Sequence, residues 1–172
     1  MRTNELLSDA FNRIGETVHA AVEGLSTEDL AWRPEPASNS IGWLVWHLTR
    51  VQDDHIADLA GQAQAWTAQQ WVTRLALPYE SAATGYGQTA DEVAAARFAP
   101  DDLLGYHDAV LTQSLDLVRG LVDSDFDRVV DESWDPPVTM GVRLISVISD
   151  DLQHAGQAGY LRGLMGRQQS AG

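Results

Sequence analysis

Three polar side chains interrupt helical faces that are otherwise apolar. His47 lies in the apolar run "SNSIGWLVWHLTR" of residues 38–50, and Asp150 and His154 lie in "SDDLQHAG". Residues four apart on a helix project from the same face, so Asp150 and His154 are expected side by side. A carboxylate in apolar surroundings is costly unless it is paired, protonated or bound to a metal. Two imidazoles and one carboxylate form a donor set for zinc or a similar divalent ion, and three protein ligands leave open positions, as in catalytic sites.

The same residues also permit a plainer interpretation, in which a lone histidine on an apolar helix face is a packed core residue. Asp151 competes with its neighbour for the carboxylate position, because it shares a helical face with His154 at a spacing of three residues. His107 lies on the inner stripe of another predicted helix and could be a fourth ligand, but we expect a supporting or packing role. Two further histidines fall off the core-facing stripes and are expected at the surface: His19 and His55.

Two residues one helical turn beyond these histidines could hold a ligand. Arg50 follows the first histidine and could contact an anionic substrate or a thiol cofactor, or could form a surface ion pair with Asp53 or Asp54. Gln157 follows the last histidine and could support it through a hydrogen bond. Three tryptophans are expected in the core and not as a substrate platform: Trp43, Trp46 and Trp134.

The composition excludes several classes of chemistry. The chain of 172 residues has a net charge of −14, which disfavours binding to nucleic-acid phosphates and to anionic membranes. It contains no cysteine and no lysine, so disulfides, cysteine nucleophiles and Schiff-base catalysis are excluded, and a strong nucleophile must come from outside. Neither a signal peptide nor an apolar run of about 20 residues is visible, and we expect a cytoplasmic protein.

Four segments with helical periodicity must position these groups. The predicted helices cover residues 3–24, 40–60, 103–122 and 140–164, and Gly166 is expected to stop the last one before a frayed tail of residues 166–172. No strand or hairpin signal is convincing. We therefore predict a single domain over residues 1–172, an all-α four-helix bundle with a long crossover between its second and third helices.

The crossover spans residues 61–100 and carries several aromatic side chains. One short helix is predicted there, opened by a capping box of Thr89 and Glu92, and a similar capped turn is predicted at Ser26 and Asp29. The segment "DESWDPPVT", residues 131–139, is expected to be a rigid loop. Long loops of this kind often cap a functional site, but this one could equally cover only one end of the core.

The two histidine-bearing segments, "NSIGWLVWHLTRVQDDH" and "DDLQHAGQAGYLRG", resemble the DinB-like superfamily. The closer similarity is to its mycothiol-dependent maleylpyruvate isomerase and mycothiol or bacillithiol S-transferase branch. The resemblance implies a four-helix bundle that holds a divalent metal through His47, Asp150 and His154. Members of the family more often carry His or Glu at the position of Asp150, which has a shorter reach than Glu.

The resemblance also implies a low-molecular-weight thiol such as mycothiol as cosubstrate, together with a second small-molecule substrate. Zinc is the expected ion, with nickel and iron as alternatives, and the DinB-like class allows a homodimer. The predicted function is that of a metal-dependent thiol S-transferase or isomerase. A non-catalytic metal or small-ligand binder and a metal-dependent hydrolase remain alternatives, whereas the lack of a His-Glu-x-x-His motif disfavours a classical zinc protease.

Overall fold

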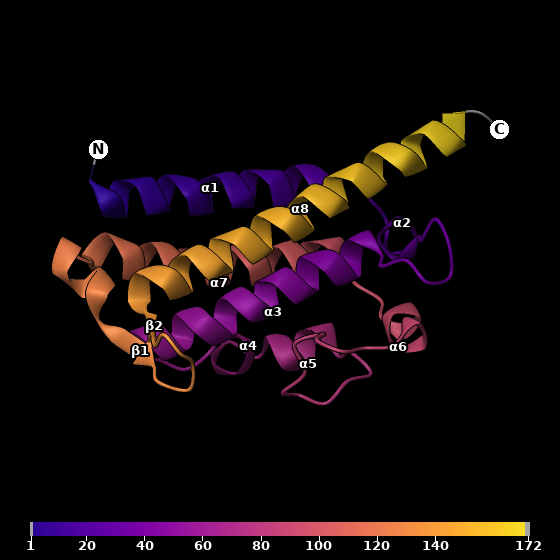
Figure 1. The fold of residues 1–172 in the computed structure, drawn as a ribbon. Coiled ribbons are helices and arrows are strands. Elements are labelled where there is room, and N and C mark those ends of the chain that lie inside the picture. Colours follow the sequence, from indigo (N-terminus) through magenta and orange to yellow (C-terminus); the bar gives the residue numbers. More distant parts are fainter. Residues whose placement is uncertain (1, 171–172) are drawn as a thin grey trace.

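Four long helices form the body of the protein, as predicted. The computed structural model describes residues 2–170, and its long helices are α1 (Thr3–Val22), α3 (Ile41–Ala60), α7 (Pro100–Gly120) and α8 (Met140–Ser170). They pack side by side along their lengths, and the remaining elements lie at the ends or on one flank (Figure 1). Among the described residues, no helix combines the length and the apolarity needed to cross a membrane.

The order of the helices around the bundle explains the long crossover. In Figure 1 the chain runs from left to right in α1 and α8 and from right to left in α3 and α7. Each of α7 and α8 packs against both α1 and α3, so α3 lies between α7 and α8. Because α3 and α7 point the same way, the chain must return along the whole bundle between them, and residues 61–99 make that return.

The ends of the helices follow from local chemistry. The Ser40 hydroxyl accepts a hydrogen bond from the Trp43 amide and begins α3, and Gly61 ends it in a left-handed conformation with φ of 62°. Pro100 opens α7 three residues earlier than predicted, because proline suits the first turn of a helix. Gly166 does not end α8, contrary to our expectation. The helix continues to Ser170 beyond the buried Met165, and residues 171–172 of the predicted tail lie outside the described residues.

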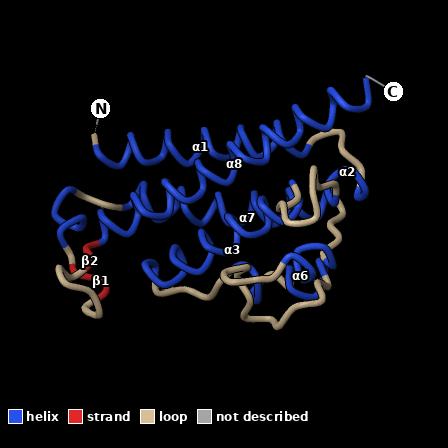
Figure 2. The backbone as a smooth tube through the Cα atoms, turned by 45° about the vertical axis from the view of Figure 1, so that its right-hand side comes forward, coloured by secondary structure: helices blue, strands red, loops and turns tan. Residues whose placement is uncertain are grey.

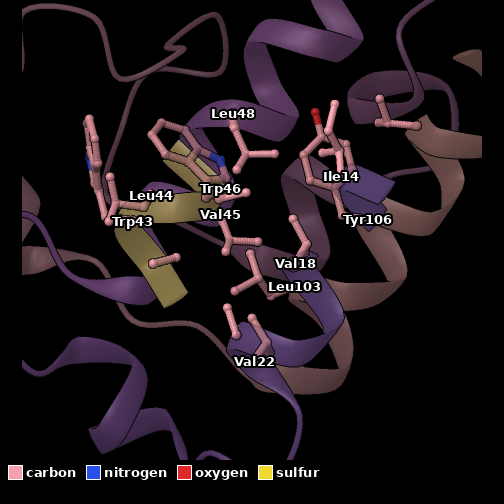
Figure 3. Packing of buried hydrophobic residues seen from close by; sticks show 14 of the residues in the cluster. Ile14, Val18, Val22, Trp43, Leu44, Val45, Trp46, Leu48, Leu103 and Tyr106 are labelled. Carbon is pink, nitrogen blue, oxygen red and sulfur yellow. The ribbon is translucent and has the colours of Figure 1, made fainter. Parts of the chain in front are cut away.

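Apolar side chains from all four long helices fill the interior. Figure 3 shows Ile14, Val18 and Val22 of α1 near Leu103 and Tyr106 of α7. Trp43 and Trp46 are buried as predicted, and α3 is the most deeply buried of the long helices. Trp134 is 65% exposed, so its placement in the core was wrong. It lies in the loop of a hairpin, which no helix covers.

A small hairpin joins α7 to α8. After a 3₁₀ turn, η1 (Asp123–Asp127), strand β1 (Val129–Asp131) pairs antiparallel with β2 (Val138–Thr139). The sequence did not predict this hairpin, because strands of two or three residues are too short to show alternation, and the fold remains all-α as predicted. The Asp131 carboxylate accepts hydrogen bonds from the backbone and hydroxyl of Ser133 and from Arg143 of α8, which holds the hairpin against the bundle.

The crossover carries three short helices, α4 (Ala65–Ala68), α5 (Trp71–Leu75) and α6 (Ala90–Ala95). Figure 2 shows them joined by loops on the flank of α3 and α7. The predicted capping box of Thr89 and Glu92 opens α6, and Ser26 with Asp29 likewise opens α2 (Thr27–Ala31). Helix α4 was not predicted from the sequence. Its first amides, those of Ala65 and Trp66, donate to the buried carboxylate of Asp53, which ties the start of the crossover to α3.

Candidate metal centre

Helices α3 and α8 bring the three predicted metal ligands together. His47 projects from α3, Asp150 and His154 project from α8, and one ligand atom from each lies within 4.8 Å of the other two. The two imidazole rings meet edge to face with centroids 4.8 Å apart. His154 Nε2 lies 3.6 Å from Asp150 Oδ1. Residues more than 100 positions apart in sequence thus share one small volume.

Each histidine has one ring nitrogen fixed and the other free for a ligand. His47 Nδ1 donates to the carbonyl oxygen of Thr84 at 2.5 Å, and His154 Nδ1 donates to Gln157 Oε1 at 3.0 Å. These contacts select the tautomer in which Nε2 carries the lone pair, and both Nε2 atoms then face the shared volume. Such outer contacts orient histidine ligands in metal sites generally.

The crossover covers His47 from one side. Gly85, with φ of 99°, packs so closely that a Cβ there would lie 2.7 Å from His47 Nδ1 and 3.0 Å from Trp43. The Trp43 ring stacks on the His47 imidazole at 4.8 Å and 17°, and its Nε1 donates to Gln88. Residues 84–88 therefore form a cap over this side of the site, one of the two roles that the sequence left open.

The donor set and its spacing fit a divalent ion. Zinc with two nitrogen ligands and one oxygen ligand at about 2.0–2.1 Å needs donors roughly 3.4 Å apart, which small side-chain rotations would achieve. Asp150 Oδ2 is buried and makes no hydrogen bond within the described chain, as expected of an atom that awaits a cation. The Asp150 and His154 side chains retain 36% and 20% of their exposure, so one side of the site stays open to solvent.

The charges of the three groups are mutually adjusted. Burial lowers the pKa of His47, which keeps its imidazole neutral. The Asp150 carboxylate raises the pKa of His154, and His154 lowers the pKa of Asp150 in return. A divalent ion that binds His154 would therefore compete with protonation of that imidazole.

The structure separates the two adjacent aspartates that the sequence could not distinguish. Asp150 faces His154 and His47, whereas Asp151 lies on the buried seam of α8 with no exposed surface. Neither Asp151 oxygen has a hydrogen-bond partner in the described chain, and burial raises the pKa of this carboxyl well above its ordinary value. Asp151 is therefore a core residue whose burial disfavours the charged carboxylate, and Asp150 is the candidate ligand.

Arg50 points into the interior and away from the open side of the site. Its guanidinium donates to the Ala83 carbonyl, to Gln64 and to the Tyr106 hydroxyl, and it lies 3.7 Å from the Asp53 carboxylate. The side chain is 1% exposed. Of our two interpretations, the ion pair with Asp53 is present, but in the core and not at the surface. Arg50 has no route to a ligand here, and we leave it out of the proposed site.

The other histidines lie elsewhere. His107 is fully buried and hydrogen-bonds to Thr49, so it packs in the core as expected. His19 bridges Glu23 and Asp108 at the surface. His55, which we expected at the surface, is half-buried instead, and burial lowers its pKa. Sequence analysis missed this partial burial and the Thr84 carbonyl; the Gly85-Tyr86-Gly87 segment was the available sign of a tight loop.

Comparison with solved structures identifies a close relative in fold. A crystal structure titled "conserved protein of locus from Enterococcus faecalis" superposes with a TM-score of 0.87 and is 28% identical. The alignment covers 94% of this chain and 96% of that one, so the two share one complete fold. No curated protein matches the sequence. The profile of the family described as Mycothiol-S-transferase matches residues 6–166, nearly the full length, and the chain therefore belongs to the mycothiol S-transferase family.

Proposed function

We propose that this protein is a metal-dependent thiol S-transferase that joins mycothiol, or a similar low-molecular-weight thiol, to a small electrophile. The observation that carries the proposal is the convergence of His47, Asp150 and His154 within 4.8 Å, with one side open. Family membership supplies the thiol, and the donor set favours zinc.

Each residue of the site would have a separate role. Two neutral imidazoles and one carboxylate would hold the ion and leave it a net charge of about +1. A divalent ion in that position supplies Lewis acidity, which lowers the pKa of a thiol near it and favours the reactive anion at neutral pH. Thr84 and Gln157 would keep the two rings aimed at the ion, and Trp43 and Gly85 would exclude water from the side of His47.

The composition of the chain supports an external nucleophile. No cysteine or lysine is present, so no side chain of the protein can attack an electrophile as a thiolate or an amine. Transfer then means that the thiol sulfur forms a bond to the electrophilic carbon, while the thiol proton goes to solvent and any leaving group departs with its electron pair.

The test combines metal analysis with a conjugation assay. Purified protein should contain about one divalent ion per chain. It should accelerate the conjugation of mycothiol with monobromobimane, and monobromobimane should be consumed at the accelerated rate only when both the metal and the thiol are present. Bacillithiol and glutathione serve as comparison thiols. His154→Ala should lose metal and about 100-fold in rate, whereas the matched control His19→Ala, at a surface histidine of α1 that bridges Glu23 and Asp108, should keep both.

Two results would contradict the proposal. A metal-loaded protein that accelerates no conjugation with any of the three thiols would be a binding protein. Turnover of an ester or amide substrate without thiol would instead indicate a hydrolase, in which water takes the place of the thiol.

A further inference from the structure

Two charged side chains of α3, Arg50 and Asp53, are buried in the interior of the bundle. They are 1% and 0% exposed, and Arg50 Nη1 lies 3.7 Å from Asp53 Oδ2. A buried ion pair adds little stability over apolar side chains of similar size, because both charges must be taken out of water. The presence of this pair in the core therefore points to a role other than stability.

The pair holds two distant parts of the crossover against α3. The Asp53 carboxylate accepts hydrogen bonds from the first two backbone amides of α4, at 2.9 and 2.8 Å. The Arg50 guanidinium donates from Nε to the carbonyl oxygen of Ala83 at 3.2 Å and from Nη1 to Gln64 Oε1 at 3.0 Å. A guanidinium can bridge these partners because it carries several donors in fixed directions.

The contact with Ala83 lies next to the candidate metal centre. Ala83 is followed by Thr84, whose carbonyl oxygen accepts the hydrogen bond from His47 Nδ1. The two carbonyls belong to successive planar peptide units, so a displacement of the first also moves the second. Among the described residues, no side chain other than Arg50 and His47 donates to these carbonyls. Arg50 therefore anchors the peptide segment whose carbonyl orients His47.

We infer that Arg50 is a positioning residue for the candidate metal centre. Through Ala83 it holds the Thr84 carbonyl against His47 Nδ1, which keeps the proton on that nitrogen and leaves the lone pair of Nε2 for the ion. Arg50 itself touches neither the ion nor a substrate. The inference rests on the metal site of the proposed function, but not on thiol transfer. Contacts that orient a metal ligand in this way change metal affinity by roughly 10- to 100-fold.

The variant Arg50→Lys tests the inference with the positive charge preserved. A lysine can remain opposite Asp53, but its single ammonium group cannot reach Ala83 and Gln64 at the same time. We expect this variant to bind zinc about 10-fold more weakly than the wild type, or weaker still. The measurement is a competition titration against a fluorescent zinc chelator.

Tyr106→Phe is the matched control. The Tyr106 hydroxyl donates to Asp53 at 2.8 Å and accepts from Arg50 Nη1 at 3.3 Å. Its loss weakens the same buried network but leaves the hydrogen bond between Arg50 and Ala83. This variant should therefore melt at a lower temperature than the wild type and bind zinc with unchanged affinity. Wild-type affinity in Arg50→Lys overturns the inference, as does an equal loss in both variants, which would assign the effect to stability.

A double variant serves if Arg50→Lys does not fold. Arg50→Met combined with Asp53→Asn leaves no unpaired charge in the core and keeps an oxygen acceptor for the amides of α4. It lacks any donor to Ala83, so we expect the same loss of zinc affinity. Wild-type affinity in this variant overturns the inference.

The tautomer of His47 gives a second readout, which needs neither metal nor thiol. Nitrogen NMR of the isotope-labelled, metal-free protein distinguishes a ring protonated at Nδ1 from one protonated at Nε2. In mildly alkaline solution the wild type should show the Nδ1-protonated form of His47, whereas Arg50→Lys should show a mixture of both forms. His154 is the internal control, because Gln157 and not the crossover holds its Nδ1. An unchanged His47 tautomer in Arg50→Lys overturns the inference.

The positioning role and the proposed activity can fail separately. If Arg50→Lys loses zinc affinity and the wild type transfers no thiol, the positioning role holds and the proposed activity is wrong. If the wild type transfers thiol and Arg50→Lys binds zinc with wild-type affinity, the proposed activity holds and the positioning role is wrong.

Discussion

Asp150 and Asp151 are chemically identical neighbours with opposite surroundings. We predict that Asp151→Asn becomes more stable relative to the wild type as the pH rises from acid to neutral, because an amide, unlike the Asp151 carboxyl, has no proton to lose. Burial raises the pKa of Asp151 above its ordinary value of 3.8, so this carboxyl lowers the stability of the folded protein as the pH rises above 3.8, and the cost is absent below that pH. Urea unfolding at neutral and acidic pH measures the difference.

The same pair of variants identifies the ligand. Asp151→Asn should retain stoichiometric metal, whereas Asp150→Asn should lose it because the anionic donor is gone. Retention of metal by Asp150→Asn, with its loss in Asp151→Asn, would show that we have assigned the wrong aspartate.

His107 predicts a loss of stability in acid. Burial lowers the pKa of His107 to about 4 from its ordinary value of 6.5. Between these values the unfolded chain binds a proton that the folded chain does not, so stability is complete above about 6.5 and falls by up to about 3 kcal/mol as the pH drops to about 4. In His107→Gln this part of the pH dependence should disappear. The measurement is the free energy of unfolding in urea at several pH values. If it falls equally with pH in the wild type and in His107→Gln, the prediction is wrong.

At this scale the sequence predicted which side chains would meet, but not how each is oriented. The spacing of four residues placed Asp150 beside His154, and the apolar context of His47 pointed to the same volume. The choice between Asp150 and Asp151 depends on the rotation of α8 about its axis, which the buried seam through Ile148 and Ala155 determines. The burial of Arg50 depends on partners in the crossover and in α7, and the local sequence around Arg50 does not predict these distant contacts.

The crossover contacts the candidate metal centre through Gly85, which packs against His47. Gly85→Ala should destabilise the protein and weaken metal binding about 10-fold or more, because its Cβ would collide with His47 Nδ1, which aims the ring. Gly87→Ala is the matched control, since φ is 74° there but a Cβ would meet nothing within 4 Å. Both variants carry the backbone penalty of a positive φ.

Calorimetric titration with zinc would separate the two effects. If both variants lose affinity equally, backbone strain in the loop is responsible and not the contact with His47.

The long helices were predictable because each repeats an apolar face over five or more turns. The short elements were not, because α4 depends on the Asp53 carboxylate of a distant helix and the β1–β2 hairpin has too few residues for a pattern. The end of α8 was misjudged for a similar reason. Glycine ends a helix only where its backbone adopts a left-handed conformation. Gly166 does not, and its neighbour Met165 is buried, so α8 continues past this glycine.

For the whole molecule, metal binding should be measurable as stability. Zinc at 1,000 times its dissociation constant would stabilise the folded state by about 4 kcal/mol, which raises the melting temperature of a chain of this size by roughly 10 °C. A chelator should reverse the shift, and His154→Ala should abolish it. An equal shift in His154→Ala would place the zinc elsewhere on this acidic surface.

The arrangement of the four helices was only partly predictable. Periodicity indicates which face of each helix is buried, but not which helix it meets. The sequence predicted a long crossover but not that α3 and α7 run parallel, and only the shared histidine site pointed to the packing of α3 on α8.

The stacking of Trp43 on His47 gives the candidate centre a natural optical signal. An indole 4.8 Å from an imidazole loses emission when that imidazole becomes positively charged or binds a paramagnetic ion. Titration with nickel or cobalt should therefore quench part of the intrinsic tryptophan fluorescence. Zinc should change the intensity of this fluorescence without paramagnetic quenching. Trp43→Phe would remove the response and leave the emission of the other five tryptophans, so occupancy could be followed in real time during turnover.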